Sequence, residues 1–127
     1  GGVLATNASG PRALMRGTPR DHIDSLSVLL DSGERVTMGC VSRWPESSSG
    51  RLQDIVTSMI TLLEQNAALL EAHRPQVALD RCGYALHDLL GPLHLQLARL
   101  LVGSEGTLGL ITEATLRTIP RAADRAI

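Results

Sequence analysis

Three glycines within seven residues, Gly103, Gly106 and Gly109, separate a predicted helix from a predicted strand near the end of the chain. Residues 93–102 before them repeat apolar positions at helical spacing. Residues 109–119 after them are rich in β-branched side chains, which favour a strand. Because glycine allows tight turns, the segment predicts exposed main-chain N–H and C=O groups at the strand entrance, suited to the polar edge of a cofactor ring. The alternative is a plain helix-to-strand connection.

Residues 1–10 at the start of the chain are also rich in glycine; they are called the first glycine-rich segment below, and residues 100–114 the second. A glycine pair at the start of a short helical turn points free N–H groups outward, where they can hold a phosphate. Short polar side chains and two nearby arginines add donors for the same anion, namely Thr6, Asn7, Ser9, Arg12 and Arg16. The alternative is a flexible chain end, because the segment matches neither the P-loop nor the dinucleotide fingerprint.

The residues between these segments predict a β-hairpin followed by helices. Residues 25–31 have the pattern of a strand, Asp31-Ser32-Gly33 supplies turn chemistry, and residues 34–38 return as a second strand. The resulting order of elements is β-β-α-α-β, and no βαβ crossover fits this spacing. We therefore expect an α+β fold in which an antiparallel sheet is flanked by helices.

Three stretches are predicted to be helical. Residues 52–70 repeat apolar side chains at helical spacing, and Ser48 or Ser49 is placed to cap the first turn. Residues 84–90 and 93–102 follow a similar pattern, interrupted by a Gly-Pro pair. Residues 76–83 give no clear pattern.

Composition excludes several classes of protein. The chain has no Phe, one Trp and one Tyr, so its core must be aliphatic, and its net charge of −1 argues against a nucleic-acid surface. No apolar run approaches the ~20 residues that span a bilayer. Cys40 and Cys82 form no disulfide or zinc pattern, so we expect reduced, partly buried thiols in a cytoplasmic protein. The Gly1-Gly2 start, without Met, leads us to expect a piece of a longer protein.

Three motifs occur together in a specific order. They are the opening Gly-Gly-x-x-Ala-Thr-Asn-Ala-Ser-Gly, the strand ending in Asp31-Ser32-Gly33-Glu34, and Gly83-Tyr84-Ala85-Leu86 followed by Gly-Ser-Glu-Gly-Thr-Leu-Gly at 103–109. Their joint occurrence resembles the FAD-linked oxidase family of the vanillyl-alcohol oxidase and p-cresol methylhydroxylase superfamily. The likeness is strongest to the branch that oxidises glycolate, D-lactate and D-2-hydroxyglutarate.

The resemblance implies that residues 1–127 are the second subdomain, or C-terminal half, of a PCMH-type FAD-binding domain. It implies non-covalent FAD, a 2-hydroxy acid substrate, hydride transfer to the flavin, and partners in the absent phosphate-loop subdomain and substrate domain. The family commonly places its catalytic base and any metal in that substrate domain, so no catalytic or metal residue is expected here. The FAD-contacting residues implied by the two segments are Gly1, Gly2, Thr6, Asn7, Ser9, Gly10, Gly106, Leu110 and Ile111.

Two reservations accompany this interpretation. Residues 41–80 are longer than in the smaller relatives and include an inserted helix, as in large members that carry an iron–sulfur region elsewhere. Without the other half, the chain is expected to bind FAD weakly or not at all. The alternative is therefore a structural or interaction module of the same fold that holds no FAD by itself.

Tyr84 is expected to pack or bond near the second glycine-rich segment, with a cofactor role as the lesser alternative, and Glu105 is expected to brace that turn.

Overall fold

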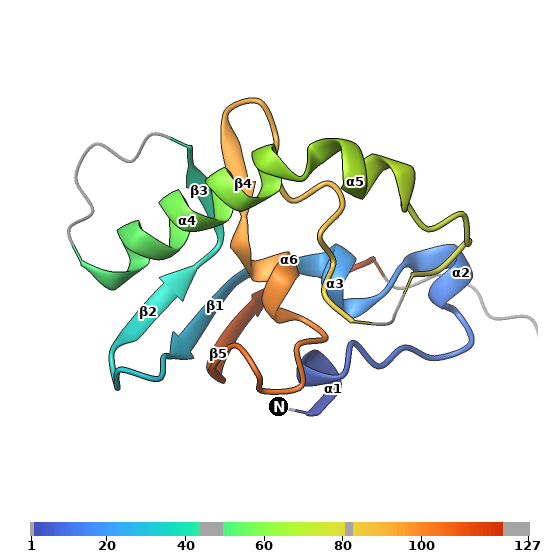
Figure 1. Ribbon diagram of the computed structural model, residues 1–127. Helices are drawn as coiled ribbons and strands as arrows, with labels where there is room; N and C mark the ends of the chain where they lie inside the picture. The colour runs from blue at the N-terminus through green and yellow to red at the C-terminus, as the bar shows by residue number, and fades with distance from the viewer. Residues whose placement is uncertain (1, 44–49, 81–82, 121–127) are drawn as a thin grey trace, which may run out of the picture.

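The computed structural model describes residues 2–43, 50–80 and 83–120 and has the expected α+β architecture. A three-stranded antiparallel sheet, in the order β2-β1-β5, lies beside a two-stranded antiparallel sheet, β3-β4 (Figure 1). The strands are β1 (Ile23–Leu29), β2 (Arg35–Met38), β3 (Cys40–Ser42), β4 (His94–Gln96) and β5 (Leu110–Leu116). The helices are α1 (Gly2–Ala5), α2 (Ala13–Arg16), α3 (Pro19–His22), α4 (Arg51–Gln65), α5 (Ala67–Ala72) and α6 (Leu97–Leu101).

The predicted hairpin is confirmed. Strands β1 and β2 pair from Leu26 opposite Met38 to Leu29 opposite Arg35. At the turn, the Leu30 N–H donates to the carbonyl of Glu34, and Gly33 takes a φ of 81°. That left-handed conformation favours glycine, which explains why Asp31-Ser32-Gly33 correctly predicted a turn here.

The predicted helix over 52–70 forms as two helices, α4 and α5, which meet at Asn66. Both helices lie along one side of the sheets (Figure 1), and Val56 and Leu63 of α4 are buried in the core. The Asn66 side chain donates to the carbonyl of Leu62 at 2.8 Å, which competes with regular helix hydrogen bonding. The predicted caps Ser48 and Ser49 lie outside the described residues, and Gly50 occupies the N-cap position.

Two predicted helices are wrong in whole or in part. Residues 84–90 are irregular, because Gly83 and Asp88 both take positive φ angles that end any helical turn. Residues 93–102 split into strand β4 and the short helix α6. Residues 94–96 form a strand and not a helix because Leu95, which is fully buried, pairs with β3. The local sequence could not reveal this partner.

Strand β5 forms an edge of the larger sheet and is covered much less than its neighbours. The core is aliphatic, as composition requires, and is centred on fully buried side chains of β1, β4 and α6 such as Leu26, Leu95 and Leu97. In contrast, Ile111 is the sole part-buried residue of β5, and the rest of the strand is exposed. Cys40 is exposed, so its predicted partial burial is wrong, and Cys82 lies outside the described residues.

Gly109 allows β5 to approach β1. It has a φ of 154°, and a Cβ at this position would lie 2.6 Å from Val28 Cγ1 and 3.1 Å from the Leu29 carbonyl oxygen. We expect Gly109→Ala to lower the free energy of unfolding by about 1–3 kcal/mol in urea titrations. The control is Gly10→Ala, where a Cβ would have no heavy atom within 4 Å. Equal stability of the two variants would contradict this account of the strand pair.

Candidate functional site

The two glycine-rich segments meet although a hundred residues separate them. The N–H of Gly103 donates to the Leu4 carbonyl and that of Glu105 to the Ala5 carbonyl, both at 2.9 Å. Helix α1 therefore lies beside the turn that leads into β5 (Figure 1). These bonds use main-chain carbonyls at the C-terminal end of α1, which have no partner within so short a helix.

Asn7 connects this junction to α3. It has a φ of 50° and is 1% exposed. Its Oδ1 accepts a hydrogen bond from the main-chain N–H of Arg20 at 3.1 Å, while its Nδ2 is buried without a hydrogen-bond partner among the described residues. Asn7 thus links two segments of the chain inside the fold. A side chain that donates to a ligand would face solvent, and that of Asn7 does not.

Arg20, a residue of α3, contacts the same junction. Its Nε and Nη2 donate to the Val102 carbonyl at 3.0 and 2.7 Å, and its Nη2 also donates to the Gly83 carbonyl at 2.8 Å. The residue is 4% exposed, and this burial lowers the pKa of its guanidinium. The guanidinium nevertheless stays charged near neutral pH, because the pKa of arginine starts so high.

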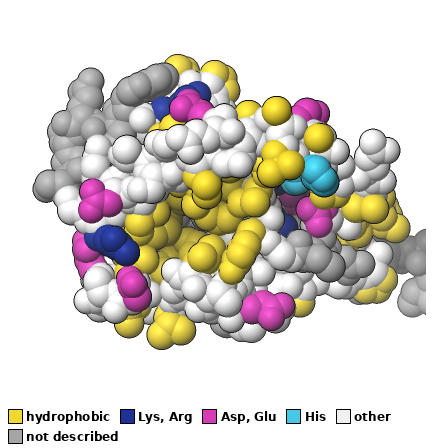
Figure 2. Space-filling model, viewed as in Figure 1, with side chains coloured by type: hydrophobic (Ala, Val, Ile, Leu, Met, Phe, Trp, Pro, Cys, Tyr) yellow, Lys and Arg dark blue, Asp and Glu magenta, His cyan; other side chains and the backbone are white. Residues whose placement is uncertain are grey.

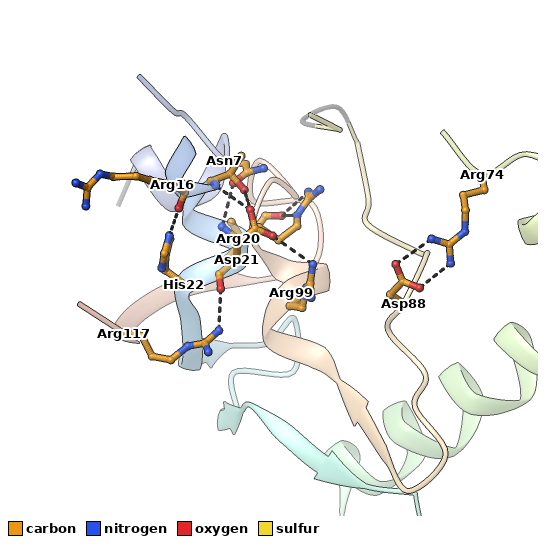
Figure 3. Close-up of polar contacts among 11 residues, drawn as sticks. Asn7, Arg16, Arg20, Asp21, His22, Arg74, Asp88, Arg99 and Arg117 are labelled. Carbon is orange, nitrogen blue, oxygen red and sulfur yellow. Dashed lines mark hydrogen bonds and ion pairs between the residues drawn. The ribbon is translucent and has the colours of Figure 1, made fainter. Parts of the chain in front are cut away.

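Asp21 holds the first turn of α3 and collects basic neighbours. Its Oδ2 accepts hydrogen bonds from Thr18 N at 2.8 Å and Thr18 Oγ1 at 3.0 Å, which completes a capping box. Its carboxylate also faces Arg99, and its carbonyl accepts from Arg117 Nη2 at 2.8 Å (Figure 3). Burial alone would raise the pKa of Asp21, but the Thr18 hydrogen bonds and the charge of Arg99 lower it.

One cavity, of about 450 Å³, opens between the first segment and the far end of β5. Ser9 and Gly10 line it from the first segment. Its basic groups come from α2, α3 and the residue after β5, namely Arg16, His22 and Arg117. The rest of its lining is mostly apolar, so the glycine and the cationic groups are the features of this cavity that suit a phosphate-bearing ligand.

A second cavity, of about 470 Å³, lies at the other end of β5 and is mostly apolar. Gly106 and Leu110 of the second segment line it, opposite Ile55 and Met59 of α4. Figure 2 shows hydrophobic side chains gathered around a hollow on this face. A Cβ at Gly106 would meet nothing within 4 Å, so its backbone is open to a ligand.

The predicted contact residues therefore fall into four groups. Ser9 and Gly10 line one cavity, and Gly106 and Leu110 line the other; the two cavities share no lining residue. Asn7 is buried between them. The remaining candidates are Gly2, exposed on α1, Thr6, whose Oγ1 donates to the Gly2 carbonyl, Ile111, which packs on the core, and Gly1, which lies outside the described residues.

Two contributors to the junction, Arg20 and Ser104, were not assigned their roles by sequence reasoning. Arg20 ends a stretch, residues 11–20, that contains three arginines and no acid, which is a composition typical of a surface, yet its side chain is buried. Ser104 is also buried, and its carbonyl accepts from Thr107 Oγ1 at 2.6 Å. Tyr84 was expected near this turn, and its hydroxyl lies 2.7 Å from Thr107 Oγ1, which confirms that expectation.

Comparisons with known proteins find that the chain is similar to part of several dehydrogenases. It is 31% identical over 120 residues to D-lactate dehydrogenase of Anaerostipes hadrus, covering 94% of this chain and 16% of that protein. It is 32% identical over 127 residues to D-lactate dehydrogenase of Archaeoglobus fulgidus, covering 100% of this chain and 18% of the relative. It is 32% identical over 127 residues to D-2-hydroxyglutarate dehydrogenase of Pseudomonas putida, covering 94% of this chain and 12% of the relative.

These relatives confirm the resemblance to the FAD-linked oxidase family that the motifs indicate. The chain spans 12 to 18% of the length of these relatives, so it corresponds to one part of such dehydrogenases. No family model matches the chain. Within the described ranges, no helix has both the length and the apolar character needed to cross a membrane.

The lowered pKa of Asp21 gives a pH dependence with a definite sign. Because its pKa in the folded state lies below the ordinary 3.8, Asp21 stabilises the fold above that value, and the contribution is lost as the pH falls through the folded pKa. We expect the wild type to lose more stability than Asp21→Asn between pH 6 and pH 3, measured as urea midpoints. Asp24→Asn, at an exposed position of β1, is the control and should follow the wild type.

Proposed function

We propose that this chain forms one wall of the FAD site in a flavin-dependent dehydrogenase or oxidase of a 2-hydroxy acid, such as D-lactate or D-2-hydroxyglutarate. The observation that carries the proposal is the junction between the two glycine-rich segments, joined through Gly103 and Glu105. The names of the relatives supply the substrate class. In this proposal, residues 1–127 are the second subdomain of a PCMH-type FAD-binding domain.

The described residues fit the chemistry of FAD, which combines a charged pyrophosphate with flat, largely apolar rings. The cavity beside Ser9 and Gly10 is mostly apolar, but it brings the side chains of Arg16 and Arg117 to a glycine-containing loop, where they can bind the pyrophosphate. The cavity beside Gly106 offers apolar walls and a strand entrance that no side chain blocks. Exposed β5 runs between the two, so an elongated ligand could contact both.

Within such a site the residues of this chain bind and orient the cofactor and exclude water from it. FAD, when bound, supplies the redox chemistry by accepting a hydride equivalent from the substrate carbon. We assign no proton transfer to this chain. The proposal therefore requires partners that complete the cleft: the phosphate-loop subdomain and the substrate domain.

The proposal also includes non-covalent FAD and a cytoplasmic location. No His or Cys of the sequence stands in a motif by which the family attaches flavin, which supports non-covalent binding. The exposed thiol of Cys40 and the absence of a disulfide pattern in the sequence favour a reducing compartment.

A scaffold without FAD is the second candidate. One observation favours it: Asn7, the central polar residue of the first segment, uses its amide oxygen inside the fold and is buried. A module of this kind would keep the junction for stability and would leave both cavities to protein partners.

Titration of the ¹⁵N-labelled chain with FAD, followed by NMR, separates the two candidates. We expect weak binding, with amide shifts concentrated at Ser9, Gly10, Gly106 and Leu110, because half of a cleft retains part of its contacts. Absence of shifts at these residues up to millimolar FAD would favour the scaffold. Tight stoichiometric binding would contradict the view that other parts of the protein are needed.

Riboflavin and ADP are matched control ligands for this titration, since each carries one end of FAD. ADP carries the phosphates and should shift residues of the cavity beside Ser9 and Gly10. The two ligands together should reproduce the pattern of FAD. The exposed Glu64 of α4 borders neither of the two cavities and serves as the internal reference for non-specific shifts.

A further inference from the structure

We infer that Arg20 is a positioning residue that sets the spacing between the two glycine-rich segments. This inference rests on the proposed function for its meaning, because those segments are the proposed cofactor contacts. The geometry behind it is independent of any ligand. Arg20 reaches both segments at once: its main-chain N–H binds Asn7 of the first, and its guanidinium binds the Val102 carbonyl at the start of the second (Figure 3).

The guanidinium is shaped for this task. Two of its nitrogens converge on the Val102 carbonyl, and Nη2 extends to the Gly83 carbonyl, so three donations join α3 to two other segments. No ion pair of Arg20 is found among the described residues, although the charge of Asp80 favours its protonated form. Carbonyl oxygens, which cannot donate, are the right partners for a group that only donates.

Gly103 is the matching feature on the other segment. It has a φ of 89°, and a Cβ there would lie 2.5 Å from Arg20 Nη2 and 3.3 Å from Asn7 Cβ. Its N–H is one of the two that bind α1. The turn can therefore sit against the arginine and α1 together only if this residue lacks a side chain. The close approach of Arg20 is therefore a second reason for glycine at this position, beside the positive φ.

Removal of the guanidinium should release the turn before it unfolds the protein. Without Arg20, the buried Val102 carbonyl loses its donors and the segment 103–106 must move to find water. The proposed cofactor contacts at Ser9 and at Gly106 would then lose their fixed separation. Lysine places one charged group at the end of a flexible stem and cannot reproduce a planar fork, so it should restore the turn in part.

The test is amide hydrogen exchange and FAD titration, both by NMR, on the full 127-residue chain. In Arg20→Met we expect at least a tenfold loss of protection at the Gly103 and Glu105 amides, and weaker FAD-induced shifts at Gly106. Arg20→Lys should lie between Arg20→Met and the wild type. Gly103→Ala should reproduce the effect with the arginine intact, and adding Arg20→Met to it should cause little further change.

Two controls exclude a merely structural role. Leu63→Ala, in the core under α4, lowers overall stability, and it should leave the FAD shifts of the folded chain unchanged. Arg74→Met removes an exposed arginine that borders neither of the two proposed cofactor cavities, and it should behave as the wild type at Gly103 and Gly106. Undiminished protection at Gly103 in a folded Arg20→Met chain would overturn the inference, as would an equal loss of FAD shifts in Leu63→Ala. If Arg20→Met does not fold, Arg20→Lys and Gly103→Ala decide by the same measurements.

If the wild-type chain shows no FAD shifts, the scaffold is favoured over the proposed function. The exchange measurement still decides whether Arg20 holds the turn, so the two ideas fail separately.

Discussion

The structure depends on a cross-connection between the first ten residues and the turn before the last strand. Main-chain hydrogen bonds from Gly103 and Glu105 to α1 close a loop that includes nearly the whole chain. Closing so long a loop costs conformational entropy, so the contact must be supported by packing and by further hydrogen bonds. The buried side chains of Asn7 and Arg20 provide that support, because they join α1, α3 and the turn in a region where water does not compete.

Most groups that the site offers to a ligand belong to the main chain. Gly10 and Gly106 present backbone, and most of the lining around both is apolar, apart from a few charged or basic groups such as Arg16 and Arg117 in one cavity and Asp31 and Arg51 in the other. In the proposed function such a surface binds the cofactor in one orientation, and no proton transfer is assigned to it. This division agrees with the lengths of the relatives, of which the chain corresponds to less than a fifth. In the proposed function, the reactive side chains would come from elsewhere in the protein.

Strand β5 is the most exposed of the described strands. Its backbone pairs with β1 on one side, while six of its seven residues are exposed, including Leu110 and Leu116. An edge strand with exposed apolar residues is unfavourable for an isolated domain, because it invites pairing with other chains. The same exposure is what a strand lining a cofactor cleft requires. Its polar middle, where Glu113 pairs with Arg35, limits that risk.

The sequence alone determined the hairpin, the helix-forming stretch before Pro75, the aliphatic core and the glycine-rich segments, because each of these depends on local backbone preferences or on composition. It also carried the family resemblance, since the motifs occur in a fixed order. Only the tertiary structure decided where Leu95, Asn7 and Arg20 lie and what they contact. Leu95 lies in a strand because its segment pairs with β3. Arg20 is buried because its guanidinium donates to the carbonyl of Val102, 82 residues away in the sequence. Contacts over such distances in the sequence leave no local pattern, so they could not be read before the chain was folded.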